Sequence, residues 1–120
     1  MQKKILLISR HAPYGSSTAK EALDAALAAA VYEQSLSLLF MDDGVFQLLK
    51  DQQAQQINQK NFSSILAALP FYDIENIYIH QESLKKRIIE NKDLLIEHAA
   101  ILTNEQISTL LNDQDHILSF

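Results

Sequence analysis

Short apolar runs alternate along this 120-residue sequence with segments of strong helix formers, and this alternation constrains the fold more than any other feature. Apolar runs of strand length in which polar and apolar residues do not alternate are typical of strands that are covered on both faces. The runs expected to form strands are residues 5–8, 36–41, 74–79, 97–102 and 116–120. Because strands separated by helices pair in parallel, we predict an α/β fold, with a three-layer α/β/α architecture around a mostly parallel five-stranded sheet. A chain of this length supports one core, so we expect a single domain over residues 1–120.

Four segments are expected to form helices on the two faces of this sheet, namely residues 19–32, 62–69, 83–90 and 103–113. The first is rich in alanine, whose small side chain lets a helix pack closely on a sheet. The last begins with Thr103 and has Gln106 three residues later, a pattern that caps the free N–H groups of a helix start. The order of the strands within the sheet does not follow from the sequence.

The charge of the chain limits its partners. Ten basic and fifteen acidic residues give a formal net charge of −5, which repels a polyphosphate unless the basic residues cluster. The longest basic run is only Lys85-Lys86-Arg87, so we expect no direct binding of nucleic acid. No stretch approaches the ~20 apolar residues of a membrane span, and we expect a cytoplasmic protein that binds no membrane.

Cysteine is absent from the sequence. Disulfide bonds, thiolate metal sites and cysteine nucleophiles are therefore excluded within this chain. Any reaction that needs a thiolate must take it from another protein.

Polar residues follow the first three expected strands, and in a parallel sheet they would lie near one edge, where α/β proteins bind ligands. They are Arg10, His11, Ser16, Asp42, Asp43, His80 and Glu82. One alternative function is therefore a stand-alone enzyme or small-ligand-binding domain that uses His11, Asp42 and His80. Imidazole and carboxylate suit zinc, but no close ligand pair and no glycine-rich phosphate motif is present, so we expect neither a metal nor a cofactor. Asp42 also has a structural interpretation, because a carboxylate just before Gly44 is a common turn former.

An apolar segment follows Gly44 and is itself followed by polar sequence. Large apolar side chains in such a place either fill the local core or form an exposed patch for a partner, and periodicity leaves both options open. Because interfaces favour aromatic and large aliphatic anchors, we predict a protein interface formed by this segment and two later aromatic residues. The predicted interface residues are Val45, Phe46, Leu48, Leu49, Phe71 and Tyr72.

Three blocks of the sequence carry a resemblance to a known family: HAPYGSSTAKEALDAALA (residues 11–28), DDGVFQLL (42–49) and PFYDIENIYIHQESLKKR (70–87), together with a final HILSF run. In these blocks the chain resembles the DsrE/DsrF-like sulfur-relay family, and most closely its TusC (DsrF-like) branch, over essentially its whole length. The most specific parts are the Pro13-x-Gly15 loop with the helix after it, residues 43–49, and residues 72–75.

The resemblance implies a domain that assembles with TusB-like and TusD-like sister subunits into a heterohexamer holding two copies of each. It further implies that the complex passes persulfide sulfur to a TusE-like acceptor, toward 2-thiouridine at the wobble position of certain tRNAs. In this family the sulfur carrier is a cysteine of the TusD-like subunit, in a loop after a strand and before a helix. His80 stands at about that place here, and an imidazole cannot carry a persulfide.

These points lead to the hypothesis of a non-catalytic structural subunit that completes the complex and helps to shape the site around a sister subunit's cysteine. His80 keeps two interpretations, a surface or interface histidine without chemistry, or an accessory general base that activates a neighbouring thiol. The chain also departs from the family's usual glycine after the basic cluster, with Ile88 and Ile89 in its place. This departure leaves the shape of that loop open.

Overall fold

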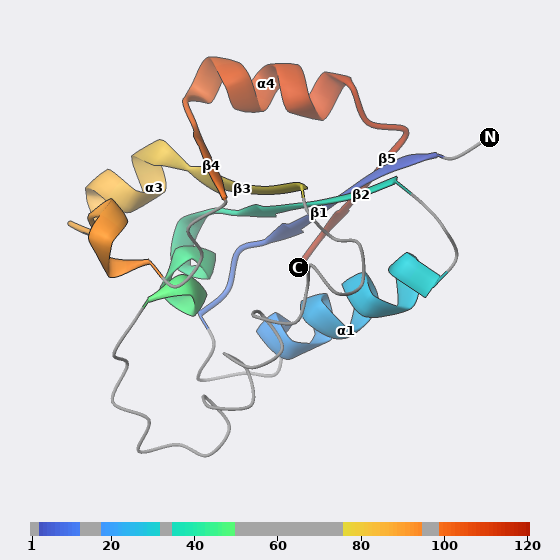
Figure 1. Cartoon of the computed structure of the whole chain (residues 1–120), viewed down its shortest axis with the longest axis horizontal. Coiled ribbons are helices and arrows are strands. Elements are labelled where there is room, and N and C mark those ends of the chain that lie inside the picture. The colour runs from blue at the N-terminus through green and yellow to red at the C-terminus, as the bar shows by residue number, and fades with distance from the viewer. Residues whose placement is uncertain (1–2, 13–17, 32–34, 50–75, 95–98) are drawn as a thin grey trace.

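The computed structural model describes residues 3–12, 18–31, 35–49, 76–94 and 99–120. Helices lie on both sides of one sheet (Figure 1). The strands are β1 (Lys4–Ser9), β2 (Ser35–Phe40), β3 (Asn76–His80), β4 (Ala100–Leu102) and β5 (His116–Ser119). The helices are α1 (Thr18–Val31), α3 (Gln81–Lys86) and α4 (Asn104–Asn112), with the 3-10 helices η1 (Asp42–Leu48) and η3 (Asn91–Asp93).

The sheet has five strands in the order β4-β3-β2-β1-β5, and every neighbouring pair is parallel. This confirms the predicted α/β/α architecture and supplies the strand order. From β1 the sheet grows to one side through β2, β3 and β4, and α4 then carries the chain back across the sheet to β5 on the other side of β1 (Figure 1). Because all strands are parallel, their carboxyl ends share one edge.

The two faces of the sheet bury alternate side chains under different helices. On one face, Leu7 belongs to a core that includes Ala22 and Ala26 of α1. On the other face, Leu6 packs with Ile107 of α4, and α1 and α4 are seen on opposite sides of the sheet (Figure 1). The consecutive residues Leu6 and Leu7 are both fully buried. Burial of each side chain stabilises the fold by about 1.5–3 kcal/mol. This explains why the first apolar run shows no polar alternation.

Helix α3 ends at Lys86, whereas the sequence predicted a helix over residues 83–90. The N–H of Ile89 donates to the carbonyl of Leu84 at 3.0 Å, and the N–H of Ile88 donates to the carbonyl of Lys85 at 3.2 Å. These two bonds form a Schellman motif, in which the residue after the helix takes a left-handed backbone. Ile88 does so with φ of 55°. The predicted helix was therefore too long, and the loop takes a glycine-like turn although it carries isoleucine.

The start of α4 agrees with the sequence. Thr103 Oγ1 accepts a hydrogen bond from the N–H of Gln106 at 3.3 Å, and Gln106 Oε1 accepts one from the N–H of Thr103 at 2.9 Å. The predicted capping pair is thus confirmed, and it fixes where α4 leaves the end of β4.

Other predictions fall partly or wholly outside the described residues. These are the helix 62–69, the first residues of the strands 74–79 and 97–102, and the interface residues Phe71 and Tyr72. Within the described segments, no helix has both the length and the apolar character that a membrane crossing needs.

Candidate functional site

At the carboxyl edge of the sheet, Gly44 lets the turn after β2 lie directly against the end of β1. A Cβ atom on Gly44 would come within 2.0 Å of the carbonyl oxygen of Ser9, so a residue with a side chain does not fit. The N–H of Met41 donates to the same carbonyl at 3.1 Å, and Asp42 takes φ of 51°. The main chain therefore holds the two strand ends together, as the rim predicted from the sequence requires.

His80, at the end of β3, has both ring nitrogens within hydrogen-bonding distance of other side chains. Its Nε2 lies 2.6 Å from Oδ1 of Asn104 and its Nδ1 lies 2.6 Å from Oγ of Ser83. An amide oxygen only accepts, so Nε2 carries the proton, and in the neutral ring Nδ1 then accepts from the Ser83 hydroxyl. Ser83 in turn accepts from the N–H of Asp42 at 2.8 Å. One network therefore joins η1, α3 and α4 through this histidine.

Asp42 directs its carboxylate to a different partner. Its Oδ2 accepts a hydrogen bond from Nε of Arg10 at 2.9 Å, and about half of each side chain is exposed. The main-chain N–H of Arg10 donates to the carbonyl of Phe120 at 2.8 Å. Arg10 and Asp42 thus meet at the rim as predicted, but as an ion pair between the ends of β1 and β2.

His11 enters the rim through its main chain. Its carbonyl accepts a hydrogen bond from Nε2 of Gln47 at 2.7 Å, and the residue is exposed. Within the described part of the chain, no group of three His, Asp or Glu side chains is arranged to hold a metal ion. The alternative site was predicted to use His11, Asp42 and His80. In the structure, Asp42 is paired with Arg10, and His80 is bonded to Ser83 and Asn104. Ser16 lies outside the described residues.

Gln47, in η1, is a buried polar residue that the sequence did not single out. It is 1% exposed, and its Nε2 donates to Oγ of Ser9 and to the carbonyl of His11, each at 2.7 Å. Its Oε1 is buried, and no hydrogen-bond partner is found for it in the part of the chain that the structure describes. The side chain thus fastens η1 to the end of β1.

Arg87 is the most enclosed cation of the basic triplet. Its Nε and one terminal nitrogen donate to Oδ1 of Asp43 at 3.1 Å and 2.9 Å, and the other terminal nitrogen donates to the carbonyl of Ser83 at 3.1 Å. The guanidinium also lies 5.8 Å from the ring centre of Phe46. Lys85 and Lys86 are exposed. Lys85 and Lys86 thus lie on the exposed side of α3, whereas Arg87 fixes the end of α3 to η1.

The predicted interface segment divides into two kinds of residue. Val45 and Leu48 are fully buried in the core of the chain, so their side chains fill space within this chain. Phe46 and Leu49 are partly exposed. The core-filling option therefore applies to Val45 and Leu48, whereas a contact of Phe46 and Leu49 with another protein stays a prediction.

Several residues of the rim were missed by the sequence reasoning. Asn104 lies just beyond the end of β4, and applying the strand-end rule to the fourth strand as well as to the first three would have found it. Ser83 lies one helical turn after His80, on the same side of α3. Gln47 gave no signal, because a glutamine beside a polar stretch reads as a surface residue.

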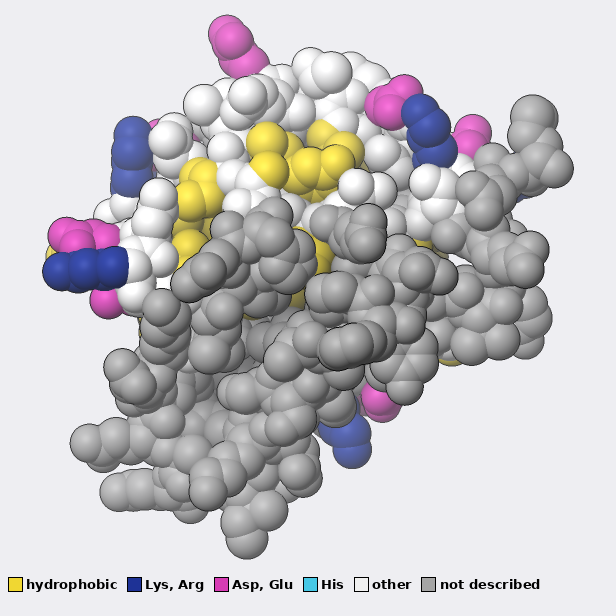
Figure 2. Space-filling model, in the orientation of Figure 1, with side chains coloured by type: hydrophobic (Ala, Val, Ile, Leu, Met, Phe, Trp, Pro, Cys, Tyr) yellow, Lys and Arg dark blue, Asp and Glu magenta, His cyan; other side chains and the backbone are white. Residues whose placement is uncertain are grey.

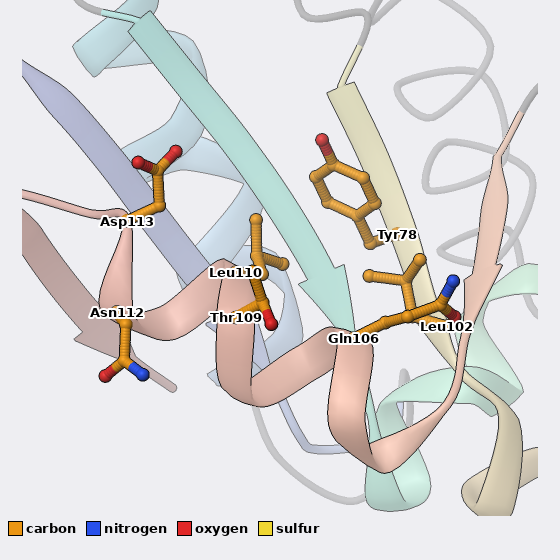
Figure 3. A pocket seen from close by; sticks show the side chains of 7 residues that line it. All are labelled: Tyr78, Leu102, Gln106, Thr109, Leu110, Asn112 and Asp113. Atoms are coloured by element: carbon orange, nitrogen blue, oxygen red, sulfur yellow. The ribbon is translucent and has the colours of Figure 1, made fainter.

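A shallow pocket of about 470 Å³ lies between α4 and the β3–β4 side of the sheet (Figure 3). Tyr78, Leu102 and Leu110 provide its apolar lining, and Gln106, Thr109, Asn112 and Asp113 of the α4 region complete it. Hydrophobic side chains reach the surface just below α4 in the space-filling view (Figure 2). Its lining therefore combines side chains of the sheet with side chains of α4 and the residue that follows it.

Comparisons with known proteins agree with this fold. The TusC homolog of Vibrio vulnificus is 36% identical over 98% of this chain and 98% of its own length. The intracellular sulfur oxidation protein DsrF of Allochromatium vinosum is 34% identical over 98% of this chain and 96% of its own length, and the TusC homolog of Pseudomonas aeruginosa is 32% identical over 99% of each. The crystal structure of the YchN protein from E. coli covers both chains completely with a TM-score of 0.81 at 24% identity, which shows the shared fold.

The family itself follows from a direct match. The model of the DsrE/DsrF-like family matches residues 3–120, a range that takes in the whole sheet and every rim residue described above. This chain belongs to the DsrE/DsrF-like family.

Proposed function

We propose that this chain is a non-catalytic structural subunit of a cytoplasmic sulfur-relay complex. In this proposal it assembles with TusB-like and TusD-like sister subunits, two copies of each, and the complex passes persulfide sulfur to a TusE-like acceptor for 2-thiolation of the tRNA wobble uridine. The names of the relatives, TusC homolog and DsrF, support a role in sulfur metabolism. Their near-complete coverage supports a comparison of whole subunits.

The observation that carries the proposal is the absence of cysteine from the sequence. In persulfide transfer, the thiolate of an acceptor attacks the outer sulfur of a persulfide, the S–S bond breaks, and the donor leaves as a thiolate. Both donor and acceptor must therefore be cysteines. This chain can be neither, so we assign it a role in assembly and in shaping the site of a sister subunit.

The surroundings of His80 support the same assignment. Its two ring nitrogens are both engaged, with Ser83 and with Asn104. To act as a general base on a neighbouring thiol, the ring would first have to give up the hydrogen bond at Nδ1. A structural histidine needs no such change, and the network explains its presence by the elements that it joins.

The proposal is tested by co-expressing this chain with the TusB-like and TusD-like chains of the same organism. We expect the three to co-purify as one species, with the mass of two copies of each by light scattering. Transfer of ³⁵S-labelled persulfide to the TusE-like acceptor should then be faster with this chain than with the sister chains alone. A chain that stays monomeric in the co-expression, or transfer that proceeds unaltered without it, would contradict the proposal.

A further inference from the structure

Ile88 combines two unfavourable features in one residue. Its side chain is 90% exposed, more than any other large hydrophobic residue among those described. Its φ of 55° lies in the left-handed region, where the Cβ of an L-residue crowds the main chain and where a β-branched side chain is rarely found. Isolated exposed hydrophobic residues are ordinary on protein surfaces, but this one is also held in a strained conformation.

The turn itself does not require isoleucine. Ile88 occupies the position after the C-cap in the Schellman motif that ends α3, where glycine fits without strain. The two hydrogen bonds of the motif use main-chain groups only, and the apolar contact that usually accompanies it is made by the next residue, Ile89, which packs against the core that contains Leu84. Among the described residues, the side chain of Ile88 therefore makes no packing contact that the turn needs.

The neighbours of Ile88 resemble the centre of a protein interface. Arg87 donates hydrogen bonds to Asp43 and lies over the partly exposed ring of Phe46, and arginine and aromatic residues are enriched among the residues that dominate binding energy. On the helix side, Lys85 and Lys86 are exposed, and among the described residues no ion pair is found for Lys86. An exposed apolar side chain thus stands beside positive charge.

We propose that Ile88 is the anchor residue of a contact with a partner protein, and that it inserts into an apolar socket whose rim carries carboxylates facing Lys86. This inference rests on the proposed function and names the contact residue for a sister subunit. A folded protein fits better than a membrane, because the chain carries a net charge of −5, which opposes adsorption to an anionic bilayer, and one side chain buries little area in lipid.

The test uses Ile88→Gly and Ile88→Asn, because both residues tolerate the left-handed conformation. In the isolated chain we expect each variant to raise the Tm by about 2–5 °C, since the strain is relieved. In titrations against the purified TusB-like and TusD-like pair, we expect each to weaken binding by about tenfold or more. Ile117→Thr is the matched control, because Ile117 is 45% exposed on β5 and has no left-handed backbone; its binding should stay within about threefold of wild type.

The outcomes are distinct. If the wild-type chain binds the sister pair and both Ile88 variants bind equally well, the anchor is wrong while the proposed function stands. If the wild-type chain does not bind the pair at all, the proposed function fails and the anchor fails with it. An equal loss of binding for Ile117→Thr would indicate a general dependence on exposed apolar surface and would overturn the assignment. So would Ile88-dependent sedimentation with phosphatidylserine vesicles together with unchanged binding of the pair.

Discussion

His80 and Asn104 come from two neighbouring strand ends, and the 2.6 Å hydrogen bond between Nε2 of His80 and Oδ1 of Asn104 links β3 to the first residue of α4. With the bond to Ser83 on the other ring nitrogen, the imidazole acts as a connector between layers. His80 looks catalytic in the sequence, but because of these bonds its removal should mainly lower the stability of the fold.

Replacement of His80 by alanine should lower the free energy of unfolding by about 1–3 kcal/mol, because Ser83 and Asn104 both lose a partner. Urea denaturation of the isolated chain measures this, with the exposed Ser108→Ala on α4 as a control that should change it by less than about 0.5 kcal/mol. In the proposed sulfur-relay complex, the variant should support sulfur transfer at nearly the wild-type rate. A large loss of transfer with assembly intact would instead favour the general-base interpretation.

Replacement of Gly44 by alanine should be among the most damaging single changes in this chain. The added Cβ would lie 2.0 Å from the main-chain oxygen of Ser9, and a main-chain atom cannot swing aside as a flexible side chain does. We expect a loss of about 3 kcal/mol or more, or failure to accumulate as folded protein. Thermal denaturation followed by circular dichroism tests this, and Ala28→Ser, exposed on α1, provides the comparison. A Tm within a degree or two of wild type would contradict the close packing of the two turns.

The ion pair of Arg87 and Asp43 should show measurable coupling in a double-mutant cycle. Arg87 is largely enclosed, with 21% of its side chain exposed, whereas Asp43 is 59% exposed. Solvent screening at Asp43 limits the expected coupling to about 0.5–1 kcal/mol. The single variants Arg87→Ala and Asp43→Ala and their combination give this value from urea midpoints. Because Arg87 also covers Phe46 and bonds to Ser83, Arg87→Ala should cost more than Asp43→Ala; an equal cost would argue against those extra contacts.

Deprotonation of Lys4 should contribute to the loss of stability at alkaline pH. Its hydrogen bond to the side chain of Asp113, and then the charge of that carboxylate, raise the pKa of Lys4 above its usual 10.5. A raised pKa in the folded state means that this stabilisation is fully present below pH 10.5 and is lost as the pH rises through the higher folded value. Wild-type chain should therefore lose Tm above this pH more steeply than Lys4→Met. If Tm fell with pH equally steeply for both proteins, Lys4 would not contribute to the loss of stability.

The sequence predicted the class of the fold because the apolar runs of β1 and β2 are buried on both faces, as Leu6 and Leu7 show, and because Thr103 and Gln106 cap α4 through local contacts. The last apolar run departs from this pattern, because all four residues of β5 are exposed. Strand order was beyond prediction, since it depends on pairs such as Ile5 and His116 that are distant along the chain. At the rim, the positions of Arg10, Asp42 and His80 followed from the parallel sheet. The hydrogen bonds at the rim could not be predicted, because Ser83, Gln47 and Asn104 come close to their partners only in the folded chain. That Val45 is buried while Phe46 is partly exposed likewise could not be predicted, because it depends on the packing around η1.

The position of β1 has a consequence for how the protein is made. This strand lies inside the sheet, yet its neighbour β5 is joined to it by contacts such as that between the N–H of Lys4 and Asp115, which are 111 residues apart. Closing so long a loop is slow relative to local pairing, and at ordinary translation rates the β5 segment emerges about 5–20 s after β1. During that interval one edge of β1 has no partner within the chain. Nascent chains should therefore pass through a stage in which β1 can pair with a strand of another chain, and binding of a chaperone would protect this edge during that stage.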